Sequence, residues 1–166
     1  LPDIQMLPLL ASYFEVSVDE LIDYVPILGR EQIRFHYQRL AQAFAQEPFG
    51  EVLAQCGELI RKYYSCYPFL EQMVVLLINH AGAADTQTDT EAAFEMSDGL
   101  CAHILEDCQD ITICKDVAGL RGVLNLMRGR PELVVRELRE AGLCGERRND
   151  VGELLVTAYL MMGERE

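Results

Sequence analysis

Apolar residues recur along the chain at helical spacing. Between Pro48 and Pro68, they fall three or four positions apart, as the buried stripe of an amphipathic helix requires: Phe49, Val52, Leu53, Cys56, Leu59, Ile60, Tyr63 and Tyr64. Similar stripes run through residues 33–44, 113–127 and 151–162. Nowhere do four or more β-branched or aromatic residues alternate with polar ones, so the pattern predicts an all-α chain without strands.

Residues that favour the start of a helix stand at the expected helix boundaries. Pro48, Pro68 and Pro131 each stand where one periodic segment stops and the next begins, as proline does at a first helical position. The polar residues 85–90 predict the longest loop. Other connections are short, which makes consecutive helices pack antiparallel. Two pairs have capping-box spacing: Thr88 with Glu91, and Ser17 with Glu20.

A short motif near the C-terminus occurs twice. Residues 126–132, Leu-Met-Arg-Gly-Arg-Pro-Glu, recur as residues 160–166, Leu-Met-Met-Gly-Glu-Arg-Glu. The glycines of the two copies, Gly129 and Gly163, are 34 residues apart. This period is typical of the tetratricopeptide repeat, a helix-turn-helix unit in which Gly closes the turn after the first helix.

Further positions resemble the tetratricopeptide repeat. Small residues stand where its two helices cross closely, at Gly122 in the first helix and Ala141 in the second, and Gly82 is expected to be the turn of an earlier repeat. The resemblance implies that residues 30–166 form stacked antiparallel helical hairpins, a tetratricopeptide-like right-handed superhelix. The array stops after a first helix, so a partner helix is expected beyond Glu166.

The first 25 residues follow a different pattern, a helix, a tight turn and a second helix that begins near Ser17. They resemble the closing helices of the Cro/repressor-type (XRE) helix-turn-helix domain, Asn-Pro-x-x-x-x-Leu-x-x-Leu-Ala followed by x-x-Phe-Gly-Val-Ser-Val-Asp-Glu-Leu-Leu. Glu15 departs from this pattern, because Gly usually serves the turn there. The alternative is an ordinary helical hairpin. Seven apolar residues would pack on the rest of such a domain: Ile4, Leu7, Leu10, Ala11, Phe14, Val16 and Leu21.

This second resemblance implies a bacterial transcription regulator with three parts. Residues 1–25 would be the remnant of a DNA-binding domain, residues 26–29 a linker, and residues 30–166 the regulatory and interaction domain. The recognition helix of such proteins would precede Leu1, so the chain is expected to be a fragment that reaches DNA only through missing N-terminal helices. A free-standing helical-repeat adaptor remains the alternative hypothesis.

Composition limits the partners. The net charge of −13 repels phosphate backbones and anionic lipids, and no stretch approaches the roughly 20 apolar residues of a membrane span, so we expect no membrane partner. Six cysteines without a CxxC pair fit free thiols in a reducing cytoplasm. The arginines between Arg128 and Arg148 alternate with glutamates, so a nucleic-acid contact there is a weak hypothesis.

Catalytic and metal-binding patterns are not evident. Cys101, His103 and Cys108 are the best metal candidates, but on a helix His103 points roughly opposite to Cys101, so packing is the favoured interpretation. His36 and His80 have no second ligand nearby. Nucleophile elbows, His-Glu-x-x-His motifs and phosphate-binding glycine loops do not occur. We therefore expect neither an enzyme nor a cofactor.

Two sets of residues are the candidate binding sites. The first helix of each tetratricopeptide repeat lines the concave face of the array, and polar side chains there can bind an extended peptide or instead meet only water. The candidates for an effector groove are Gln72, Asn79, His80, Glu153 and Thr157. The truncated end of the array is expected to expose an apolar face for a homodimer, with Leu155, Tyr159 and Met162 as candidates.

Overall fold

The computed structural model describes residues 4–21, 27–140 and 149–163, and no strand occurs in these ranges. The predicted all-α class is therefore confirmed. Near the N-terminus lie η1 (Ile4–Met6), α1 (Leu7–Tyr13) and α2 (Val18–Leu21). The remaining helices are α3 (Arg30–Phe44), α4 (Phe49–Lys62), α5 (Tyr67–His80), η2 (Ala81–Ala83), α6 (Gln87–Asp107), α7 (Ile111–Met127), α8 (Pro131–Glu140) and α9 (Asn149–Met162).

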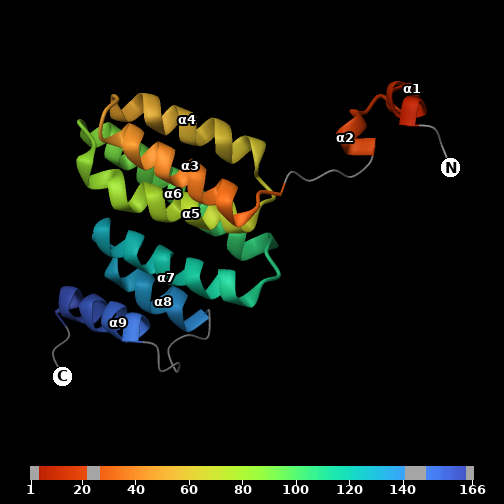
Figure 1. The fold of residues 1–166 in the computed structure, drawn as a ribbon. Helices are drawn as coiled ribbons and strands as arrows, with labels where there is room; N and C mark the ends of the chain where they lie inside the picture. Colours follow the sequence, from red (N-terminus) through yellow and green to blue (C-terminus); the bar gives the residue numbers. More distant parts are fainter. Residues whose placement is uncertain (1–3, 22–26, 141–148, 164–166) are drawn as a thin grey trace.

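Helices α3 to α9 pack in chain order as a stack (Figure 1). Each helix contacts the next one in the sequence, from the pair α3 and α4 to the pair α8 and α9. The odd-numbered helices also contact one another in series, α3 with α5, α5 with α7, and α7 with α9. They therefore form one continuous layer. We call its members the odd-numbered helices of the stack.

The main hydrophobic core is centred on α5. This helix is apolar almost all round and contacts α3, α4, α6 and α7, as expected of a helix without a solvated face. Its side chains Phe69, Leu70, Met73 and Leu77 are almost completely buried. A second core cluster joins α7, α8 and α9 through Ala118, Val134, Leu138, Val151 and Ala158. The stack is thus held together along its whole length by apolar packing.

The three prolines lie at helix starts, as predicted. Pro48 is the N-cap residue of α4, Pro68 is the second residue of α5, and Pro131 is the first residue of α8. A backbone N–H at these positions has no partner inside the helix, so the missing donor of proline costs nothing there.

The predicted long loop at residues 85–90 is wrong. Helix α6 begins at Gln87, and Thr86 is its N-cap residue in place of Thr88. The Thr86 hydroxyl oxygen accepts a hydrogen bond from the backbone N–H of Asp89 at 3.1 Å, and it donates to the Asp89 carboxylate at 2.8 Å. Polar composition therefore marked a helix start here, because hydroxyls and carboxylates satisfy the free N–H groups of a first turn.

Two of the three predicted turn glycines adopt the left-handed conformation. Gly129 has φ of 68° and Gly163 has φ of 78°. After α7, the N–H groups of Gly129 and Arg130 donate to the carbonyls of Leu126 and Asn125, which forms a Schellman motif. Gly82 differs, because it lies in the short helix η2 and lacks a positive φ.

The N-terminal segment ends its first helix in the same way. Glu15 has φ of 57°, and the N–H of Val16 donates to the carbonyl of Ala11 at 3.0 Å. The position where the resembling family carries Gly is therefore left-handed here, with a side chain that disfavours that region. Of the seven apolar residues expected to pack, Ala11 is buried and two others are half-buried, and the exposed ones are Ile4, Leu10, Phe14 and Val16.

The predicted linker at residues 26–29 overlaps the start of the stack. Pro26 lies outside the described residues. Leu28 is buried in the main core, and its N–H lies 3.4 Å from the Cys66 sulfur. Gly29 is the N-cap residue of α3, and its N–H donates to the Gln32 side chain at 2.9 Å. Leu28 and Gly29 therefore belong to the stack.

Candidate functional site

Two neighbouring cavities lie along the odd-numbered helices. The first, between α3 and α5, has a volume of about 500 Å³, and the second, between α5, α7 and α9, has about 490 Å³. Glu71 on α5 lines both cavities, so they adjoin. Each volume lies within the range typical of ligand sites in proteins. We call the two cavities together the groove.

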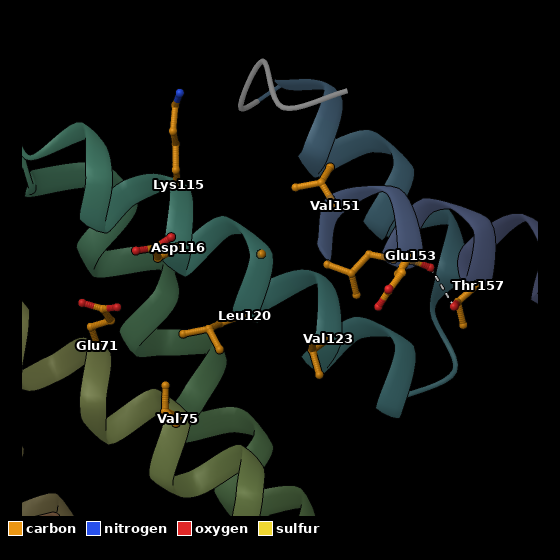
Figure 2. A pocket seen from close by; sticks show the side chains of 11 residues that line it. Glu71, Val75, Lys115, Asp116, Leu120, Val123, Val151, Glu153 and Thr157 are labelled. Atoms are coloured by element: carbon orange, nitrogen blue, oxygen red, sulfur yellow. Dashed lines mark hydrogen bonds between the residues drawn. The ribbon is translucent and has the colours of Figure 1, made fainter. Parts of the chain in front are cut away.

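The second cavity has an apolar floor and an acidic rim. Val75 on α5 and Leu120 and Val123 on α7 form much of the floor. Figure 2 shows Glu71 on α5 beside Asp116 on α7, with the α9 residues at the other end of the cavity. The carboxylates therefore come from different helices that the fold brings together. The lining residues on α9 are Val151, Glu153, Leu154 and Thr157.

Carboxylates crowd around Glu71. Partial burial raises the pKa of the Glu71 carboxyl above its ordinary value, and the negative charges of Asp116 and Asp110 raise it further. Asp110 is the N-cap residue of α7, where its carboxylate accepts from the N–H of Thr112 at 2.8 Å. The lining cation, Lys115, extends away from the labelled carboxylates (Figure 2). The electrostatics of this cavity favour a cationic group.

The first cavity has the opposite charge at its α3 side. Arg30 and Arg34 line it one helical turn apart, together with Tyr37 and Gln38 of the same helix. Neither arginine forms an ion pair with another residue of the described chain. Two cations at the positive end of a helix repel one another and the helix dipole. An anion bound between them would relieve both repulsions.

The predicted groove residues divide between the groove and the helix packing. Gln72 lines the first cavity, and Glu153 and Thr157 line the second. Asn79 and His80 line neither cavity. The Asn79 amide nitrogen lies 3.5 Å from the Tyr37 hydroxyl.

His80 packs where α3 and α5 end together. Its ring stacks on Phe44 with centroids 4.9 Å apart, and its Nδ1 lies 2.8 Å from the carbonyl oxygen of Leu76. The ring is therefore engaged in helix packing. His80 was predicted to line the groove from its distance along the chain to the turn glycine. That distance does not show which side chains of neighbouring helices pack around the end of a helix.

The predicted dimer surface is only partly exposed. Leu155 is half-buried against the second core cluster, Tyr159 is half-buried, and Met162 is 40% exposed. The large apolar side chains that α9 exposes are Val156, Leu160, Met161 and Met162. Leu155 therefore packs within the stack. Three of the apolar side chains that α9 exposes were not among the predicted residues: Val156, Leu160 and Met161.

The candidate metal residues have other partners. The Cys101 side chain is completely buried, and burial raises its thiol pKa to about 12. The His103 ring stacks on Tyr64 with centroids 3.9 Å apart, and its nitrogens lie near the Tyr64 carbonyl oxygen and Asp107. Within the described residues, no three His, Cys, Asp or Glu side chains are grouped as metal ligands.

A polar network between α6, α7 and α8 was missed from the sequence. The Arg121 guanidinium donates to Asp98 at 2.9 Å and lies 3.6 Å from a Glu137 oxygen. The buried Asn125 amide donates to the other Glu137 oxygen at 3.0 Å. Arg128, the C-cap residue of α7, also pairs with Glu91 on α6. These bonds fix the three helices relative to one another behind the groove.

No protein-family model, curated protein or solved structure matches the chain. None of the described helices is long and apolar enough to cross a membrane.

Proposed function

We propose that the stack is the regulatory and oligomerisation portion of a DNA-binding transcription regulator and senses a peptide or protein effector in the groove. The observation that carries the proposal is the pair of adjoining cavities along the odd-numbered helices, with Glu71 common to both. In this proposal the stack is a tetratricopeptide-like array, whose first helices would be α3, α5, α7 and α9. The 34-residue spacing of Gly129 and Gly163 supports it.

The lining of the groove suits an extended peptide. Apolar floor residues such as Leu120 and Val123 can accept side chains of the peptide, while Gln72, Thr157 and Tyr37 offer polar groups for its backbone. Main-chain binding by polar side chains is independent of sequence, whereas the charged rim selects among peptides. The groove thus combines general affinity with specificity.

The N-terminal segment supports the link to DNA. Its two helices and the left-handed Glu15 between them agree with the turn geometry that the resemblance to the Cro/repressor-type domain implies. The exposed Ile4, Leu10 and Phe14 form an apolar surface that the rest of such a domain would cover. With a net charge of −13, the present chain is expected to bind duplex DNA poorly by itself.

Regulators of this kind read paired half-sites, which favours a homodimer. The exposed side chains of Val156, Leu160 and Met161 on α9 supply an apolar surface for a second copy. Sedimentation equilibrium should show a dimer in the micromolar range, and Leu160→Glu should shift it to monomer. A strict monomer would leave pairing to DNA or to a partner.

The groove itself can be tested by filling it. Gly119 lines the second cavity on α7, and no atom lies within 4 Å of the place that a Cβ would occupy. Gly119→Phe should therefore project a ring into the groove without disturbing the fold. Gly99→Phe on α6 is the matched control, because Gly99 is exposed, equally open and outside both cavities.

The probe is a synthetic library of random octapeptides with free ends, followed by calorimetric titration of the enriched sequences. We expect Gly119→Phe to lower their affinity at least about tenfold, while Gly99→Phe and the wild type bind alike. Equal affinity of the two variants would show that the peptides do not bind in the groove. Chromatin immunoprecipitation separates a transcription regulator from an adaptor, because only a regulator should occupy specific genomic sites.

A further inference from the structure

We infer that the groove binds a short peptide in one direction, with its C-terminal carboxylate between Arg30 and Arg34 and its N-terminal ammonium at Glu153, the far end of a negative rim that begins at Glu71 and Asp116. This inference rests on the proposed peptide-binding function and adds the chemical class and polarity of the ligand. The ligand is a linear peptide whose two ends are free.

The carboxylate end follows from the geometry of α3. Arg30 and Arg34 face the same cavity one turn apart, and both side chains are exposed and lack an ion-pair partner within the described chain. Guanidinium groups bind carboxylates through two parallel hydrogen bonds, which a blocked amide end cannot replace. A C-terminal carboxylate would bind both cations at once.

Tyr37 adds a neutral donor at this end of the groove. Its hydroxyl oxygen lies 3.5 Å from the Asn79 amide nitrogen, which can only donate. The Tyr37 hydroxyl is thereby an acceptor toward Asn79, and its own proton is available for a carboxylate oxygen in the cavity.

The ammonium end follows from the second cavity. Glu71, Asp116 and Glu153 come from three different helices and line the same space. Repulsion from Asp116 adds to burial in raising the pKa of Glu71, so a cation in this space would stabilise the charged carboxylates. Exposed Glu153 on α9 extends the negative rim to the far end of the groove.

The length of the ligand follows from the spacing of the helices. Packed helices lie about 8–10 Å apart, so the three steps from α3 through α5 and α7 to α9 cover about 24–30 Å. An extended peptide advances about 3.3 Å per residue. A peptide of about eight residues therefore reaches from Arg30 to Glu153.

Four octapeptide libraries test the direction: free ends, N-acetylated, C-amidated, and blocked at both ends. For wild-type protein we expect each single block to weaken the binding of enriched sequences about tenfold. In Arg30→Gln/Arg34→Gln, amidation should no longer matter while acetylation still does. In Glu71→Gln/Glu153→Gln, acetylation should no longer matter while amidation still does. Arg61→Gln on α4 is the control, because Arg61 is exposed and lines neither cavity.

Three results would contradict the inferred direction of the bound peptide. Loss of the acetylation effect in the arginine variant would reverse the direction and overturn the inference. Equal binding of all four libraries would also overturn it, while leaving peptide binding in the groove intact. If no library binds, both the proposed peptide-binding function and this inference are wrong. Circular dichroism melting of each variant confirms that the fold is retained, since Arg30, Arg34 and Glu153 are exposed.

Discussion

Replacing Glu137 by Ala tests the polar network behind the groove. The Glu137 side chain is only 13% exposed, and its two oxygens serve the Asn125 amide and the Arg121 guanidinium. Truncation to Ala leaves the amide of Asn125, which is 4% exposed, without this acceptor, while Arg121 keeps Asp98. A buried polar group without a partner costs about 1–3 kcal/mol, so we expect the free energy of unfolding to fall by about 2 kcal/mol.

Two further variants separate the causes. Glu137→Gln keeps an acceptor for Asn125 and removes the charge, whose burial already raises the pKa of this carboxyl. It should therefore cost less than about 1 kcal/mol. Glu140→Ala is the control on the exposed side of α8 and should change stability by less than about 0.5 kcal/mol. Urea unfolding measures all three, and equal stability of Glu137→Ala and Glu140→Ala would refute the network's contribution.

Three other predictions concern single positions. Gly129→Ala should cost about 1–2 kcal/mol in urea unfolding because φ is 68°, whereas Gly99→Ala within α6 should gain about 0.5–1 kcal/mol. Cys56 and Cys101, with thiol pKa values raised by burial to about 12, should resist iodoacetamide at pH 8 until the protein unfolds, and rapid alkylation would contradict their burial. Since the pKa of Glu71 is raised in the folded state, its contribution to stability is present at low pH and should be lost as pH rises through that pKa. Glu71→Gln should remove this dependence of stability on pH, measured by urea unfolding between pH 4 and 7.

The elements of the fold could be predicted from the sequence because their causes are local. The spacing of apolar residues gave the helical segments, and the prolines at 48, 68 and 131 marked three helix starts. Gly129 and Gly163 marked two left-handed turns. Each of these signals acts within one or two helical turns of the residue itself. Residues 85–90 were misjudged because capping residues and loop residues have the same composition.

The candidate site could be predicted only in part. Counting back from the turn glycines selected Gln72, Glu153 and Thr157, which line the two cavities, because position along a helix fixes the direction of a side chain. Arg30 and Arg34 were missed, although two arginines one turn apart at a helix start are unusual on electrostatic grounds. Their sequence signal was a pair of arginines four positions apart at the start of a predicted helix, with Glu31 between them.

The sequence by itself determined that the chain is helical and where several of its helices begin and end. Only the tertiary structure decided that Glu71 meets Asp116, that His80 stacks on Phe44 and that Asn125 reaches Glu137. These pairs join different helices, and their separations depend on how the helices cross and on which side chains fill the space between them. Helical periodicity determines which residues share a face, but packing across the stack determines which faces enclose a groove.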